Sequence, residues 1–142
     1  MINNSLTNDF DLQSSVETWT IHPKMSTTHG ISASAAVTNN VAKFSVMIPG
    51  LIGKETVSIR NNGTEKYLRH SGWIMHLGQW TSDDLFQHDA TFHLAKENCA
   101  EGFVIKSENF PSKALKFLGI DNNIQVITYE PSEAFCWVFL PQ

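Results

Sequence analysis

The chain has 142 residues, of which 42% are hydrophobic, 11% aromatic and 17% charged, and its formal net charge is −4. This length suits one domain with its own hydrophobic core, and the aromatic content argues against disorder. The acidic balance, without a basic run, disfavours a nucleic-acid binder, and no apolar stretch is long enough to span a bilayer.

The N-terminal segment carries few structural signals. Residues 1–9 are polar and Asn-rich, and we expect them to be loose. The first 17 residues lack the basic start and apolar segment of a secretory signal, so the protein is either intracellular or given as a mature form, and its localisation stays open. Cys99 and Cys136 form no CxxC pair or zinc pattern. We interpret them as two free thiols, although a disulfide stays possible.

Short runs of β-branched and aromatic residues predict strands along the chain. In order, these runs are 18–21, 57–60, 92–95, 103–105, 124–127 and 137–140. Turn signals lie between them at 61–63, 71–72, 109–111 and 121–123. Many short strands separated by turns are typical of an all-β sandwich or barrel.

An internal repeat narrows this prediction. Segments 57–61, 66–70 and 89–92 match 103–107, 113–117 and 134–137 in the same order, at an offset of about 46 residues. A weaker copy lies within 18–44. We therefore expect residues 1–142 to form a single β-trefoil domain with lobes 10–54, 55–101 and 102–142. The predicted core comprises Trp19, Ile21, Phe44, Val46, Val57, Ile59, Leu68, Phe92, Leu94, Val104 or Ile105, Leu115, Val126, Trp137 and Phe139.

The middle copy resembles a known family. The segments that carry the resemblance are 57–60 (Val-Ser-Ile-Arg), 66–70 (Lys-Tyr-Leu-Arg-His) and 86–92 (Phe-Gln-His-Asp-Ala-Thr-Phe). They are similar to the lobes of the arabinose-binding domain of fungal α-L-arabinofuranosidase B. The resemblance implies a non-catalytic β-trefoil that binds arabinofuranose side chains or a similar glycan. It also implies that His70 and Asp89 hold the sugar hydroxyls.

The chemistry of a small sugar agrees with this assignment. A carboxylate accepts hydroxyl hydrogen bonds, a neutral imidazole both donates and accepts, and an aromatic ring covers the C–H face. Asp89 is expected to begin a strand and His70 to end one. Trp73 and Trp80 could wall the site, whereas Tyr67 would need a bend to share it. His88 stands where the family has an acidic residue, and we include it among the candidate ligand-binding residues.

The other two lobes depart from the pattern. Lobe three has Phe117 and Ala134 in place of the His and the Asp, and lobe one has His29 but Val41. Each missing polar partner costs about 1–3 kcal/mol of sugar binding. We therefore expect at most one site of the family type, in lobe two.

Sugar binding has alternatives. Asp89 can serve a purely structural role by accepting backbone N–H hydrogen bonds in a turn, and His70 can do so by bonding to a backbone carbonyl. The histidines show no metal-ligand spacing, no glycine-rich phosphate loop or nucleophile motif occurs, and no opposed pair of carboxylates is evident. We thus expect no metal, no cofactor and no enzymatic activity. The alternative function is a degenerate β-trefoil that binds a protein partner or acts as an inhibitor.

Overall fold

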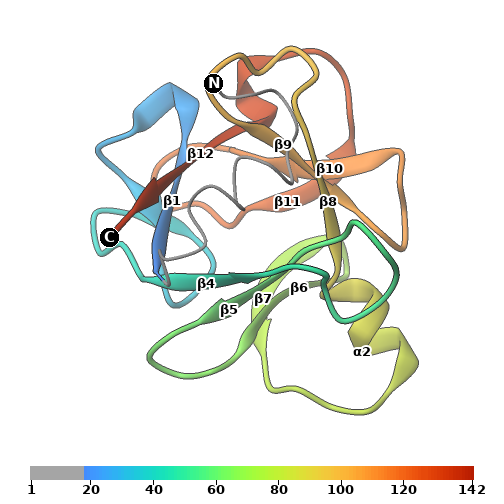
Figure 1. Ribbon diagram of the computed structural model, residues 1–142. Helices are drawn as coiled ribbons and strands as arrows, with labels where there is room; N and C mark the ends of the chain where they lie inside the picture. The colour runs from blue at the N-terminus through green and yellow to red at the C-terminus, as the bar shows by residue number, and fades with distance from the viewer. Residues whose placement is uncertain (1–17) are drawn as a thin grey trace.

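The computed structural model describes residues 18–142, so the prediction for residues 1–9 lies outside the described part (Figure 1). The regular structure of the described residues is almost all β-strand, with one short α-helix, α2 (Asp84–Asp89). Two 3-10 turns are η1 (Lys24–Ser26) and η2 (Glu133–Phe135). The strands are β1 (Trp19–Pro23), β2 (Gly30–Ile31), β3 (Val37–Thr38), β4 (Phe44–Met47), β5 (Ser58–Asn61), β6 (Tyr67–Ser71), β7 (Ile74–Gly78), β8 (Phe92–Ala95), β9 (Phe103–Ser107), β10 (Lys113–Lys116), β11 (Gln125–Thr128) and β12 (Cys136–Pro141).

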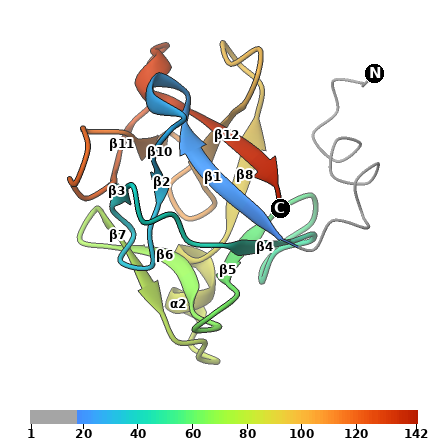
Figure 2. The ribbon, with the colours of Figure 1, turned by 90° about the vertical axis from the view of Figure 1, so that its left-hand side faces the viewer.

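Six strands form a closed antiparallel ring. β1 pairs with β4, β4 with β5, β8 with β9, β9 with β12, and β12 with β1. The Val57–Phe92 bridge joins the start of β5 to β8 and completes the ring. The other strands form the hairpins β2–β3, β6–β7 and β10–β11 (Figure 2). The result is a barrel-like sheet in which most backbone edges are paired.

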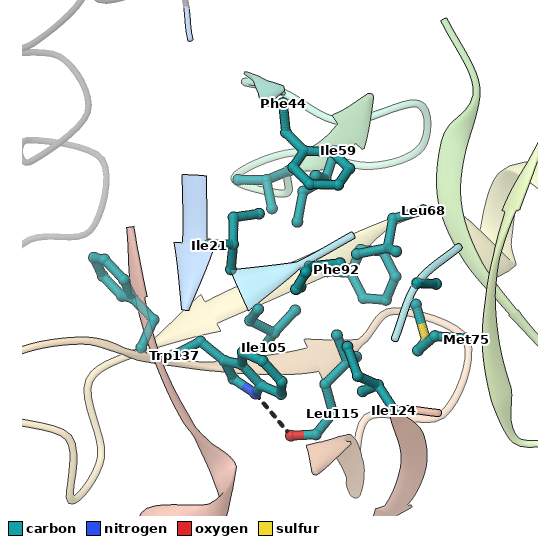
Figure 3. Close-up of a cluster of buried hydrophobic side chains, with 14 of the residues drawn as sticks. Ile21, Phe44, Ile59, Leu68, Met75, Phe92, Ile105, Leu115, Ile124 and Trp137 are labelled. Carbon is teal, nitrogen blue, oxygen red and sulfur yellow. Dashed lines mark hydrogen bonds between the residues drawn. The ribbon is translucent and has the colours of Figure 1, made fainter. Parts of the chain in front are cut away.

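One hydrophobic cluster fills the barrel (Figure 3). The predicted core residues belong to it or pack against it, with Ile105 rather than Val104 facing this cluster. The reason is the period-2 alternation of the strands: in β8, Phe92 and Leu94 are buried while His93 and Ala95 are half-buried. Trp137 is fully buried, and its indole Nε1 donates a hydrogen bond to Leu115 O at 3.0 Å.

The interpretation of the cysteines as free thiols is wrong. Cys99 and Cys136 form a disulfide, with their Cα atoms 5.7 Å apart. Strand pairing explains it, because Val104 in β9 lies opposite Ala95 in β8 and opposite Cys136 in β12. The two cysteines, 37 residues apart in sequence, therefore approach each other across β9.

None of the helices in residues 18–142 is long and apolar enough to cross a membrane. No group of three or more potential metal ligands gathers in this part of the chain.

Candidate functional site

A surface cavity of about 360 Å³ lies where the β6–β7 hairpin, helix α2 and the β9–β10 loop meet. In Figure 1, α2 lies beside β6 and β7 at the lower right of the barrel. The cavity brings together the ends of elements from the middle and last thirds of the chain. Its lining residues are Arg69, His70, Ser71, Gly72, Trp73, Leu85, Asp89, Asn109 and Phe110.

Asp89 is the last residue of helix α2, not the first residue of a strand as expected. The helix begins after Asp83, whose carboxylate accepts a hydrogen bond from the Phe86 backbone N–H at 3.2 Å. Phe86 and Asp89, three residues apart, lie on one helical face, and both are buried. The helix therefore carries the carboxylate of Asp89 to the barrel instead of leaving it in solvent.

Three side chains surround the Asp89 carboxylate. Asn109 Nδ2 donates a hydrogen bond to Oδ1 at 2.9 Å, and His70 Nε2 lies 3.4 Å from the same oxygen. Arg69 Nη2 lies 3.6 Å from Oδ2. Asp89 is 6% exposed, so these partners offset the cost of burying its charge. The carboxylate is thus held in a defined orientation at the cavity wall.

His70 lies in β6 opposite the core residue Met75, and its side chain is buried. It also forms part of the cavity wall. Its Nε2 is 3.2 Å from Ser107 Oγ. Because a carboxylate only accepts hydrogen bonds, the proton of the neutral ring belongs on Nε2, and Nδ1 is left as an acceptor. Burial lowers the pKa of His70; the Asp89 carboxylate opposes this shift and the Arg69 cation adds to it. The ring is therefore neutral at pH 7.

An aromatic pair stands at the mouth of the cavity. The rings of Trp73 and Phe110 meet edge-to-face with centroids 4.7 Å apart, and Trp73 stacks on His70 at 6.0 Å. Trp73 is 43% exposed. Lys113 Nζ lies 4.8 Å from the centre of the Trp73 ring. The cavity thus combines a polar wall with an exposed aromatic rim.

The β6–β7 turn determines the position of Trp73. Ser71 pairs with Ile74, which leaves Gly72 and Trp73 as a two-residue loop, and both have positive φ, 60° and 65°. This geometry matches the right-handed twist of a hairpin, but it is strained for a bulky residue. Strain of this kind is concentrated at functional sites.

Three residues that the sequence analysis connected with the site do not line the cavity. Tyr67 is buried and packs edge-to-face against Phe86, with ring centroids 6.3 Å apart. β6 is a continuous strand, without the bend that Tyr67 would need to share the site with His70. His88 lies on α2, and its Nδ1 is 2.9 Å from the Asp84 carbonyl oxygen. Trp80 is half exposed but does not line the cavity.

Six lining residues were missed: Arg69, Ser71, Gly72, Leu85, Asn109 and Phe110. Arg69 was visible only as part of the Tyr-Leu-Arg-His segment. Residues 109–111 were interpreted as a turn, and the polar Asn109 was the only signal of another role. It lies 20 residues from Asp89 in sequence, so only the packing of the β9–β10 loop brings the two together.

Phe117 and Ala134, which the sequence repeat aligns with His70 and Asp89, carry no polar side chain. The Phe117 backbone N–H donates to Ala134 O at 2.8 Å, so these two positions are neighbours. Ala134 lies in η2, just before β12, as Asp89 lies in α2 before β8. Neither phenyl nor methyl groups bind hydroxyls.

Comparison with known proteins identifies the family. The model of the alpha-L-arabinofuranosidase B (ABFB) domain matches residues 13–133. The chain belongs to this family. Domains of this type are carbohydrate-binding modules of arabinofuranosidases, which confirms the resemblance seen in the sequence. No curated protein sequence matches the chain significantly.

Solved structures share the fold of this ABFB domain at low identity. A GH54 α-L-arabinofuranosidase soaked with a cyclic sulfate inhibitor is 17% identical with a TM-score of 0.72. An arabinofuranosidase complexed with arabinofuranosyl-α-1,2-xylobiose is 16% identical with a TM-score of 0.71. Both matches cover 89% of this chain but only 31% of the other. The designed threefold-symmetric protein ThreeFoil is 10% identical, with a TM-score of 0.66 over 88% of this chain and 99% of its own.

Proposed function

We propose that this ABFB domain is a non-catalytic carbohydrate-binding module that holds one arabinofuranosyl group, or a similar small sugar, in the cavity between His70 and Asp89. The observation that carries the proposal is the buried carboxylate of Asp89 beside the buried imidazole of His70 at the wall of an open cavity. Such a pair matches the alternating donors and acceptors of a polyhydroxylated ring.

Each wall of the cavity has a role in this proposal. Asp89 accepts a hydrogen bond from one or two sugar hydroxyls, and His70 Nδ1 accepts from another. Trp73 and Phe110 cover the C–H face of the ring. Among the residues lining the cavity, Asp89 is the only carboxylate, whereas glycoside hydrolysis ordinarily uses two. This difference supports binding without catalysis.

The proposal includes the fold type. We infer a β-trefoil with lobes 10–54, 55–101 and 102–142. Its support is the closed six-stranded ring with three outer hairpins, together with the similarity to a threefold-symmetric design. Only the middle lobe retains both polar residues of the site. A single shallow site of this kind gives weak affinity unless copies are linked together.

The test is calorimetric titration with methyl α-L-arabinofuranoside and with arabinofuranosyl-α-1,2-xylobiose. We expect binding by the wild type and at least a tenfold loss in Asp89→Asn, which keeps the shape of the side chain but removes its charge. Glu101→Gln is the matched control, because it removes one charge from an exposed loop outside the cavity.

Two results would contradict the proposal. One is equal affinity in the wild type and Asp89→Asn. The other is release of free arabinose from arabinoxylan by the isolated chain, which would show catalysis. If no sugar on a glycan array binds while a protein partner co-purifies through loops outside the cavity, the chain is the interaction module described as the alternative.

A further inference from the structure

We propose that a second hollow, between β7 and the β10–β11 loop, is a subsite for a neutral sugar residue attached to the one held by His70 and Asp89. This inference rests on the proposed function and extends it to oligosaccharides. The hollow has a volume of about 440 Å³ and is lined by Ile74, His76, Leu118, Asn122, Asn123 and Gln125.

The two hollows are lined from the two neighbouring strands of one hairpin, the first from β6 and the second from β7. In the β6–β7 register, Ser71 is opposite Ile74 and Arg69 is opposite His76. Directly paired residues point to the same face of a hairpin. Arg69 and Ser71 line the first cavity, whereas Ile74 and His76 line the second. Paired strands are only about 5 Å apart, so a chain of two or three sugar residues is long enough to cross the hairpin.

The chemistry of the second hollow suits a neutral polyhydroxylated ring. Its polar groups are side-chain amides and an imidazole, and none of its lining residues is an acid, a lysine or an arginine. An amide donates and accepts at once, as neighbouring sugar hydroxyls require. Within the described part of the chain, the side chains of Asn123 and Gln125 make no hydrogen bond, so both are free to bind a ligand. Ile74 and Leu118 provide apolar surface for C–H groups.

The hollow is held open by backbone hydrogen bonds. The Asp121 N–H donates to Val37 O at 2.7 Å, and Asn123 forms a bridge with Ala36. These contacts fix the β10–β11 loop against the neighbouring hairpin. Asn122 Nδ2 donates to Leu118 O at 2.6 Å and closes the loop on itself. A site formed in advance loses little conformational entropy when it binds.

Backbone hydrogen bonds join β11 and the residue before it to the β6–β7 hairpin, and so link the two hollows. The Val126 N–H donates to Trp73 O at 2.8 Å, and the Met75 N–H donates to Ile124 O at 2.9 Å. The strand that carries Gln125 is therefore bonded to the turn that carries Trp73. These hydrogen bonds fix the distance and orientation between the aromatic rim of the first cavity and the amides of the second hollow.

The test uses NMR titration, because the side-chain amides of Asn109, Asn123 and Gln125 report directly on the two sites. We expect methyl α-L-arabinofuranoside to shift the Asn109 signals alone. Arabinofuranosyl-α-1,2-xylobiose should also shift those of Asn123 and Gln125 and bind about tenfold more tightly. The double variant N123A/Q125A should bind both sugars with the affinity of the monosaccharide.

Gln79→Ala is the matched control, since Gln79 is an exposed amide just beyond the far end of β7. It should leave both affinities unchanged. Shifts confined to Asn109, with the same trisaccharide affinity in the double variant, would overturn the second subsite and leave the proposed function intact. Shifts at Asn123 and Gln125 without any at Asn109 would refute the His70–Asp89 site instead.

Discussion

At the scale of single residues, the candidate site depends on keeping one buried imidazole neutral. His70 is 3% exposed, and the groups that face it are Asp89, Arg69, Ser107, Trp73 and Phe110. Burial lowers its pKa, so the charged form is disfavoured in the folded protein. The ring can then accept a hydrogen bond from a sugar hydroxyl, which an imidazolium cannot do.

This shift predicts a pH dependence. An unfolded histidine titrates near pH 6.5, and the folded pKa lies below that value, so the unfolded state binds more protons between the two. The contribution to folding stability is complete above pH 6.5 and is lost as the pH falls toward the folded pKa. Urea unfolding measures the loss of unfolding free energy between pH 7.5 and pH 5.5, and this loss should be smaller in His70→Gln than in the wild type. In His76→Gln, which removes an exposed histidine, the loss should equal that of the wild type. Identical decreases in all three proteins would contradict the prediction.

Asn109 is predicted to position Asp89. Its amide makes the shortest hydrogen bond to that carboxylate, and removal leaves a buried acceptor short of one partner. We expect Asn109→Ala to lose about 1 kcal/mol of unfolding free energy and to bind arabinofuranosides several-fold more weakly. Calorimetry and urea unfolding measure the two effects. Asn40→Ala, at an exposed turn, should change neither quantity. Full affinity in Asn109→Ala would show that Asp89 needs no such support.

At the scale of elements, helix α2 decides whether Asp89 reaches the cavity. The helix has six residues and begins at the Asp83 cap. Without its cap so short a helix is marginal, because few backbone hydrogen bonds hold it. The cap and the buried face of Phe86 therefore position Asp89, although neither residue lines the cavity.

Asp83→Ala should cost about 1 kcal/mol of unfolding free energy, which is the usual cost of losing an N-cap. It should also weaken arabinofuranoside binding, because Asp89 lies at the other end of the same helix. Urea unfolding and calorimetry are the measurements. Asp84→Ala removes a neighbouring charge and leaves the cap bond in place, so its effect should be smaller. Equal effects of the two changes would mean that the cap does not control the position of Asp89.

At the scale of the whole molecule, stability comes from one shared core and one covalent link. The barrel interior is a single cluster to which strands from every part of the described chain contribute. The Cys99–Cys136 disulfide links the β8–β9 loop to the start of β12. Such a link stabilises the fold chiefly by reducing the conformational freedom of the unfolded chain.

Removal of the disulfide is predicted to be costly. For a loop defined by a sequence separation of 37 residues, the double change Cys99→Ser and Cys136→Ser should lower the unfolding free energy by about 2–4 kcal/mol. Urea unfolding with and without a reductant measures it. The reductant should destabilise the wild type and leave the double variant unaffected. A wild type that is insensitive to reductant under unfolding conditions would contradict the prediction.

The core and the family could be predicted from the amino-acid sequence alone. Strand periodicity marks which side chains point inward, and Phe44, Phe92 and Trp137 are buried as that pattern predicts. The segments around His70 and Asp89 were enough to indicate the ABFB family, because family motifs are local in sequence. His70, Asp89 and Trp73 were likewise identifiable as lining residues from their positions in or beside these segments.

The construction of the cavity could not be predicted in this way, because it depends on contacts between distant segments. The place of Asn109 beside Asp89, the pairing of Cys99 with Cys136 and the exclusion of Tyr67 all depend on which loops and strands are neighbours in the barrel. Helix α2 was also unexpected, since six residues are too few to show a helical period. Local patterns record which face of a strand is buried, but contacts between distant segments arise only when the barrel closes.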